Sequence, residues 1–172
     1  FEFEDGSTSD TRLAQALKTT FLGSCAFVRL SFAGAPNSTR LACTIWCHHG
    51  SGNGLTPHSP LTRLYHVMHQ FDADIYVIGH QSKKPVVKVP YLYMGKKPPY
   101  PIIAQNRVLA GTGGFAEGYH HKSRDWTGTR PQGGYVERAM MPPAALGGVV
   151  LRIRPVYGGK GYGARLDISV EV

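Results

Sequence analysis

The stretch Asp74-Ile75-Tyr76-Val77-Ile78-Gly79-His80-Gln81-Ser82 decides how this sequence is expected to fold. Its run of apolar residues, from Ile75 to Ile78, is typical of a short strand that is buried on both faces of a sheet. The strand pattern ends at Gly79, and His80 begins a polar segment. A side chain in that position lies at the C-terminal edge of a sheet, where ligand sites of α/β proteins tend to lie.

A second stretch, Trp46-Cys47-His48-His49-Gly50, repeats this pattern, with His48 placed 32 residues before His80. It ends an apolar run and precedes a glycine-rich loop. Neutral imidazole is the commonest metal ligand, and two histidines at strand ends can converge on one ion. We therefore predict that His48 and His80 share one metal ion. The alternative is a pair of structural histidines with ordinary hydrogen-bond partners.

Turn residues and hydrophobic periodicity predict the other elements. A helix is expected over Arg12 to Thr19, and a second one begins at Ser59, where Pro60 suits the first turn. Its apolar residues at helical spacing are Leu61, Leu64, Met68 and Phe71. Strands are expected over 25–32, 41–47, 86–94, 102–110, 149–156 and 164–172, with hairpins at 25–47 and 149–172. The helix between the two histidine segments should make their strands parallel neighbours.

The composition is that of one globular domain. The 172 residues are 42% hydrophobic and 17% charged, and the net charge is +8. Such a chain can bury a core, and its basic surface suits phosphate-bearing substrates or nucleic acid. No apolar run approaches the ~20 residues of a membrane span, and no signal peptide is recognised. We expect a cytoplasmic protein without a membrane partner. Because the first residue is Phe1, the chain is expected to begin partway through a larger protein.

The three cysteines are Cys25, Cys43 and Cys47. Their odd number and irregular spacing favour a reduced, intracellular protein. The interval between Cys43 and Cys47 is not that of a zinc-binding pair, and both residues fall within an expected strand. We therefore expect buried free thiols rather than zinc ligands.

Taken together, the two histidine segments resemble the last two metal motifs of calcineurin-like metallophosphoesterases. The matching elements are a strand ending in His-His-Gly-Ser-Gly at 48–52, a helix, and Asp-Ala-Asp-Ile-Tyr-Val-Ile-Gly-His-x-x-Lys at 72–83. The order of the segments 111–118, 133–138 and 142–148 is similar to a branch found in phage and prophage genomes. The resemblance implies an α/β sandwich of mixed β-sheets with flanking helices. Residues 1–172 would form the β-rich C-terminal half of that single domain.

The resemblance also implies an activity and a set of ligands. The family hydrolyses phosphoesters with two divalent ions, which here could be manganese, zinc, iron or magnesium. His48 matches the ligand that ends the fourth motif, and His80 matches the first His of Gly-His-x-His, a ligand of the same ion. Ser82 stands where the second His of that motif should hold the other ion, and a serine hydroxyl is a poor ligand for these ions. The Asp-x-His, Gly-Asp and Asn-His patterns of the first three motifs do not occur in the sequence.

Other polar residues are candidates for substrate binding. His49 could contact the phosphate as a catalytic residue, or it could support the neighbouring ligand. Lys83 and Lys84 could steer an anionic substrate, and His120-His121-Lys122 in the long loop at 118–134 could reach it. Three further histidines are expected at the surface or in packing contacts, namely His58, His66 and His69.

Three functions remain open on the sequence alone. The first is metal-dependent phosphoester hydrolysis, with the isolated chain expected to be inactive. The second is a truncated, non-catalytic phosphoesterase remnant that serves as an interaction domain. The third is a nucleic-acid-binding protein that grips a phosphate backbone with its basic charge and with Tyr119, Trp126 and Tyr135. A half-domain would expose apolar surface, so we also expect self-association or a missing N-terminal half as a partner. If phage-encoded, the protein would act in the host cytoplasm.

Overall fold

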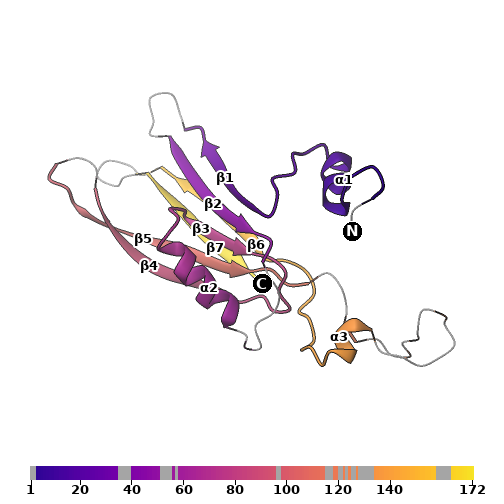
Figure 1. The fold of residues 1–172 in the computed structure, drawn as a ribbon. Helices are drawn as coiled ribbons and strands as arrows, with labels where there is room; N and C mark the ends of the chain where they lie inside the picture. Colours follow the sequence, from indigo (N-terminus) through magenta and orange to yellow (C-terminus); the bar gives the residue numbers. More distant parts are fainter. Residues whose placement is uncertain are drawn as a thin grey trace.

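The fold is mixed α/β with mostly β-structure. In this computed structural model the described residues are 3–34, 40–50, 56, 58–95, 98–114, 118–119, 122, 124, 127, 134–157 and 164–172. The strands are β1 (Cys25–Phe32), β2 (Leu41–His48), β3 (Ile75–Ile78), β4 (Val86–Met94), β5 (Ile102–Gly111), β6 (Val150–Val156) and β7 (Arg165–Glu171). The helices are α1 (Ser9–Ala16), α2 (Ser59–Met68) and α3 (Tyr135–Arg138). Figure 1 shows their arrangement.

The core of the fold is a mixed sheet with the strand order β1-β2-β3-β5-β4. Strands β2, β3 and β5 run parallel, and the two edge strands pair antiparallel with their neighbours. The crossover through α2 makes β2 and β3 parallel, because a helix between paired strands returns the chain to the same end of the sheet. The prediction of parallel neighbours is therefore confirmed. The carboxyl ends of three strands lie together at one edge.

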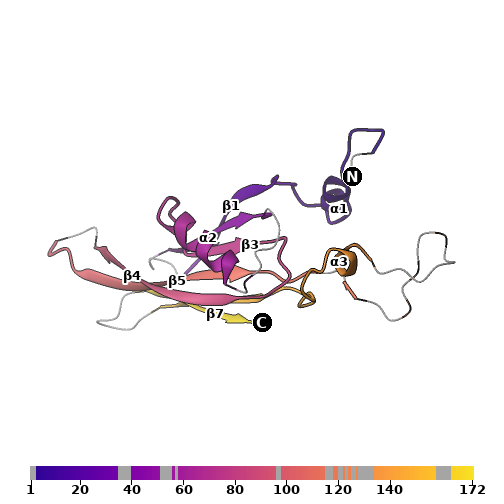
Figure 2. The same ribbon diagram turned by 60° about the horizontal axis from the view of Figure 1, so that its bottom comes forward.

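The two faces of this sheet have separate cores. Helix α2 covers one face, where Leu64 and Met68 pack with Trp46, Tyr76 and other buried residues. The β6–β7 hairpin covers the other face, and Ile168 packs there in a cluster with strand residues of the large sheet. Figure 2 shows α2 and β7 on opposite sides of the sheet. The short strand β3 is buried on both faces, as its uninterrupted apolar sequence predicts.

Helix α2 begins where predicted but ends at Met68, so the expectation that Phe71 lies on it is wrong. Phe71 follows in the turn that leads into β3. The hydroxyl of Tyr76 donates to the carbonyl of Phe71 and accepts from the amide of Ala73, which fixes this turn. Phe71 instead stacks on Trp46, with ring centroids 5.7 Å apart.

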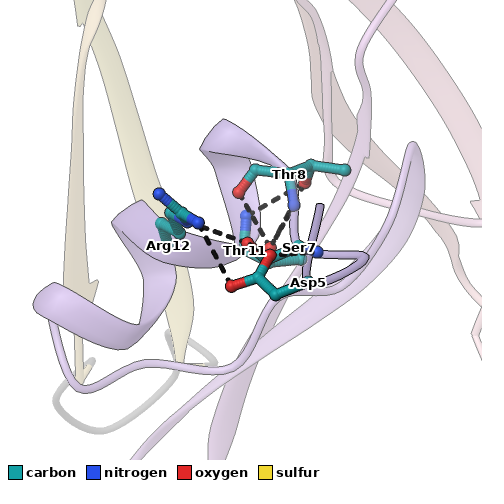
Figure 3. A network of polar contacts seen from close by, with 5 residues as sticks. All are labelled: Asp5, Ser7, Thr8, Thr11 and Arg12. Atoms are coloured by element: carbon teal, nitrogen blue, oxygen red, sulfur yellow. Dashed lines mark hydrogen bonds and ion pairs between the residues drawn. The ribbon is translucent and has the colours of Figure 1, made fainter. Parts of the chain in front are cut away.

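Helix α1 begins at Ser9, three residues before the predicted start. Thr8 is the N-cap residue: its hydroxyl accepts from the amide of Thr11, and the Thr11 hydroxyl accepts from the amide of Thr8 (Figure 3). This reciprocal capping places the first helical turn before Arg12. Leu13 on this helix is 59% exposed, so its apolar side chain is largely uncovered.

The N-terminal turn is held by polar contacts to Asp5, which are also drawn in Figure 3. The hydroxyl and amide of Ser7 donate to the Asp5 carboxylate, and Arg12 forms an ion pair with it at 3.1 Å. The hydrogen bonds from Ser7 lower the pKa of Asp5 below its usual value. Arg12 also lies over the ring of Phe3. Together these contacts join the turn to the first part of α1.

The thiols are free, as the sequence predicts, but they differ in burial. Cys43 is buried and Cys47 is half-buried, whereas Cys25 is exposed. The expectation of a buried thiol is thus confirmed for Cys43 and holds in part for Cys47, whereas Cys25 begins the edge strand β1. Among the residues that the structure describes, no helix is long and apolar enough to cross a membrane.

Candidate functional site

The two histidine segments meet at the carboxyl edge of the sheet. His48, the last residue of β2, is in register with Ile78, the last residue of β3. The amide of Gly79 donates to the carbonyl of His48 at 2.9 Å, and the amide of Thr112 donates to the carbonyl of Ile78. The backbone at the ends of three parallel strands is therefore continuously hydrogen-bonded, which holds the histidine segments side by side.

Two glycines allow these segments to approach closely. Gly50 has a φ of +92°, and a Cβ atom on it would lie 2.2 Å from the carbonyl oxygen of Gly79. A Cβ atom on Gly79 would lie 2.9 Å from the carbonyl oxygen of His49. Any larger residue at Gly50 would therefore combine an unfavourable left-handed conformation with a steric clash. Gly50 and Gly79, which follow the two strands, therefore allow the two backbone segments to pack closely as well as to turn.

The closest side-chain contact at this edge joins His49 and His80. The Nε2 atom of His49 lies 3.2 Å from the Nδ1 atom of His80, and the ring centroids are 5.1 Å apart. Both residues are exposed. His80 has a φ of +54°, a left-handed conformation that is uncommon outside glycine. Such strained residues cluster at functional sites, where the surrounding structure holds them in place.

The contacts of the His48 side chain differ from those expected of a metal ligand. Its ring stacks on Trp46, and its Nδ1 atom accepts a hydrogen bond from the amide of Gly50 at 2.8 Å. A nitrogen that accepts this bond has its lone pair engaged, and the neutral ring then carries its proton on Nε2. His48 therefore has no free lone pair for a metal ion in this arrangement. That His48 and His80 share an ion stays a prediction, while the ring contact of His80 is with His49.

The His49–His80 pair has the spacing of two ligands on one ion. With metal–nitrogen distances of ~2.0–2.1 Å, two imidazole nitrogens on a tetrahedral ion lie about 3.3 Å apart. The observed 3.2 Å fits this spacing, and it is also the length of a hydrogen bond in which one ring N–H donates to the other ring nitrogen. A catalytic zinc usually has three protein ligands. Within the described part of the chain, no three His, Cys, Asp or Glu side chains group closely enough to hold an ion. The described residues therefore offer at most two imidazole nitrogens to an ion at this edge.

The segment after His80 is fixed against the loop at 142–147. Ser82 is only 7% exposed, and its carbonyl accepts from the amide of Ala145. The Nζ atom of Lys83 donates to the carbonyl of Pro143 at 3.4 Å. Lys84 lies against Gly113, whose absent Cβ would meet the lysine stem at 2.9 Å. Ser82 is thus part of a buried segment that is hydrogen-bonded to the loop at 142–147. In the sequence, both lysines follow His80 within four residues.

The other residues predicted to bind substrate or nucleic acid, or to lie at the surface, are in other parts of the structure or outside the described residues. Tyr119 is exposed, and its hydroxyl donates to the carbonyl of Met141. His120, His121, Trp126 and the side chain of Tyr135 lie outside the described residues. The expectation of surface positions is confirmed for His58, His66 and His69, which are all exposed.

A second polar site, not predicted from the sequence, lies at the opposite end of β3. Arg107 lines a cavity of about 540 Å³ there, and its side chain is almost fully buried. The guanidinium donates to the carbonyl of Met68, pairs with Asp72 at 2.6 Å and stacks on Tyr91. Because these contacts occupy the guanidinium, Arg107 is a structural link between α2 and β5. A charged residue at an inward-facing position of a strand is the signal that identifies it.

Comparisons with models of protein families, with curated proteins and with solved structures gave no match for this chain.

Proposed function

We propose that this chain is the C-terminal, β-rich half of a calcineurin-like, metal-dependent phosphoester hydrolase, and that His49 and His80 hold one divalent ion at the sheet edge. The observation that carries the proposal is the 3.2 Å separation between His49 Nε2 and His80 Nδ1. A divalent ion at such a site polarises a phosphoryl oxygen and makes its bound water more acidic.

The protein contributes preorganisation of the two rings. The hydrogen bonds at the ends of β2 and β3 fix the backbone, and Gly50 allows it to approach Gly79. For both facing nitrogens to offer lone pairs, the neutral rings must carry their protons on His49 Nδ1 and His80 Nε2. The outer nitrogens would then be hydrogen-bond donors, which suits contact with a phosphate oxygen.

The charge of the chain supports an anionic substrate. The net charge is +8, and Lys83 and Lys84 follow His80 directly after Gln81 and Ser82. The net positive charge would raise the local concentration of phosphate-bearing molecules around the chain, and this effect weakens as salt increases. Manganese, zinc, iron and magnesium all remain candidates for the ion; imidazole ligands favour zinc and iron, whereas manganese and magnesium would take most of their remaining ligands from water and phosphate oxygens.

Binding of Mn²⁺, followed by the loss of its free EPR signal, tests the proposal on the whole chain. We expect the wild-type chain to bind Mn²⁺ and His80→Asn to bind at least about tenfold more weakly. Asparagine is the preferred replacement because it tolerates a left-handed backbone. His69→Asn, a change at the exposed C-cap residue of α2, is the matched control and should bind like wild type.

Inorganic phosphate then tests the substrate class. Its ³¹P relaxation should be enhanced more by Mn²⁺ with the wild-type chain than by Mn²⁺ with His80→Asn. Equal Mn²⁺ affinity of the wild-type chain and His80→Asn would contradict the proposal. A chain that binds no Mn²⁺ but binds DNA with a steep salt dependence would instead be a nucleic-acid-binding protein.

A further inference from the structure

The central sheet has an opening between β2 and β5. Strand β3 has only four residues, Ile75–Ile78, whereas β2 has eight and β5 has ten. Its pairing with both neighbours starts at Ile75, so none of the described strands lies between residues 41–44 of β2 and 102–107 of β5. Asp74 directly precedes β3 and therefore lies at the base of this opening.

The Asp74 carboxylate bridges the two sides of the opening. One of its oxygens accepts a hydrogen bond from the amide of Thr44 on β2, and the other accepts from the side-chain amide of Gln105 on β5. A carboxylate has about four lone-pair positions, so about two of them stay available. No Lys, Arg or His among the described residues forms an ion pair with Asp74. In that part of the chain, the carboxylate is therefore held by neutral donors alone.

Asp74 lines a cavity of about 540 Å³ beside the end of α2. This volume lies within the range of sites that bind small molecules. Three aromatic side chains also line the cavity, those of Phe71, Tyr91 and Tyr93. The guanidinium carbon of Arg107 lies 3.7 Å from the centre of the Tyr91 ring, so one aromatic ring of this cavity already contacts a cation.

The charged side chains that line this cavity favour a positively charged ligand. With His69 neutral, they are the carboxylates of Asp72 and Asp74 and the guanidinium of Arg107. Arg107 pairs with Asp72 at 2.6 Å. That pair leaves the carboxylate of Asp74 without a counter-ion in the cavity, in a chain whose net charge is +8.

A second cavity, of about 740 Å³, meets Asp74 from the side that β7 lines. Lys88 and Arg165 contribute positive charges to its lining, and Asp167 contributes a further carboxylate. The two cations would repel a positively charged ligand. The first cavity, in which the only cation is already paired, is therefore the better site for such a ligand.

We propose that the cavity beside Asp74 binds a small organic ammonium ion. The N–H groups of the ammonium donate to the available lone pairs of Asp74, and its alkyl part lies against the ring of Tyr93, which is 38% exposed. This cavity lies at the opposite end of β3 from His80, so the inference is independent of the proposed function.

Titration of the full chain with n-butylammonium chloride, followed in ¹H–¹⁵N spectra, tests the inference. The backbone amide of Thr44 and the side-chain amide of Gln105 should shift to saturation, because both donate to the carboxylate that holds the ligand. The neutral molecule n-butanol, which has the same size, should bind about tenfold more weakly, because it cannot form the charged pair.

Two substitutions and one control separate the carboxylate from the ring. Asp74→Asn should weaken binding of n-butylammonium about tenfold, and Tyr93→Leu should weaken it about threefold. Asp10→Asn removes an exposed carboxylate on α1 and should leave the Kd unchanged. A thermal melt of each variant checks folding, and Tyr93→Leu decides the outcome if Asp74→Asn does not fold.

Three results would overturn the inference. The first is a wild-type chain in which neither amide shifts to saturation, and the second is equal affinity for n-butylammonium and n-butanol. The third is a Kd that stays the same in the folded variants of Asp74 and Tyr93, or that rises equally in Asp10→Asn.

Discussion

His49 Nε2 lies 3.2 Å from His80 Nδ1, although the two residues come from different strand ends. The contact exists because β2 and β3 are parallel neighbours and finish at the same level of the sheet. Gly50 then brings the chain after β2 against Gly79. The distance between the two rings therefore depends on close backbone packing, which leaves no room for a Cβ atom on Gly50.

Substitution of Gly50 should be more damaging than substitution of another glycine with the same backbone conformation. Gly50 and Gly147 have φ values of +92° and +90°, but a Cβ atom would meet neighbouring atoms within 4 Å only at Gly50 of these two. Gly147→Ala should cost about 1–2 kcal/mol, the usual penalty of a left-handed non-glycine residue. Gly50→Ala should cost clearly more and weaken Mn²⁺ binding.

Urea unfolding of both glycine variants, with Mn²⁺ titrations of the folded chains, makes this comparison. Equal losses of unfolding free energy would mean that the close approach of Gly50 to Gly79 does not hold in solution.

Arg107 should matter more for stability than the carboxylate that it pairs with. Its buried guanidinium stacks on Tyr91 and bonds to the carbonyl of Met68, whereas the Asp72 side chain is 95% exposed. Arg107→Ala should lower the free energy of unfolding by about 2–4 kcal/mol, because it removes packing and leaves a buried carbonyl unsatisfied. Asp72→Ala should cost less than about 1 kcal/mol, as exposed ion pairs do. Chemical denaturation measures both, and a larger loss for Asp72→Ala would contradict this account.

Burial of Cys43 should make the fold sensitive to alkaline pH. Loss of hydration, with a smaller contribution from nearby Asp74, raises the pKa of this thiol to about 12. In the unfolded chain the thiol ionises near pH 8.5–9. The folded chain thus holds more protons between these values, so the stabilising contribution is complete below about pH 9 and is lost as pH rises toward 12.

Unfolding free energies between pH 8 and pH 11 provide the test. The wild-type chain should lose up to about 1.4 kcal/mol per pH unit more than Cys43→Ala above pH 9. Cys25→Ala, which changes an exposed thiol, should follow the wild-type slope. Parallel curves for wild type and Cys43→Ala would show that this thiol ionises without unfolding.

The isolated chain should show little or no phosphodiesterase activity. Two imidazoles leave a divalent ion mostly hydrated, and a catalytic ion usually needs a third protein ligand to position its water. A model phosphodiester assayed with added Mn²⁺ measures this. Metal-dependent turnover that is lost in His80→Asn would mean that the chain assembles a more complete centre than its described residues indicate.

The sequence predicts the strands and their neighbours well because these depend on local patterns. Val86–Met94 alternates and forms a strand as expected, the hairpin at 25–47 forms, and Ile75–Ile78 is the buried central strand. The start of α1 is harder to predict, because the reciprocal bonds of Thr8 and Thr11 decide it rather than the apolar spacing. The end of α2 depends on Tyr76, a residue eight positions beyond the helix.

The choice between His48 and His49 follows from the geometry of a strand end. Trp46 and His48 are two residues apart on β2, so they share a face, and the rings stack. His49 lies just after the strand and can turn toward His80. Alternation along β2 is enough to predict the face of the sheet on which His48 lies. The approach of His80 to His49 depends in addition on the pairing of β2 with β3.

A long-range ¹H–¹⁵N spectrum of the histidine rings during Zn²⁺ titration tests whether His49 and His80 bind one ion. Such spectra identify which ring nitrogens carry protons and which bind the ion. We expect His49 Nε2 and His80 Nδ1 to shift together and to saturate at one ion per chain, while His48 Nδ1 is unchanged. Joint shifts of His48 and His80 without His49, or no shift at His80, would contradict it.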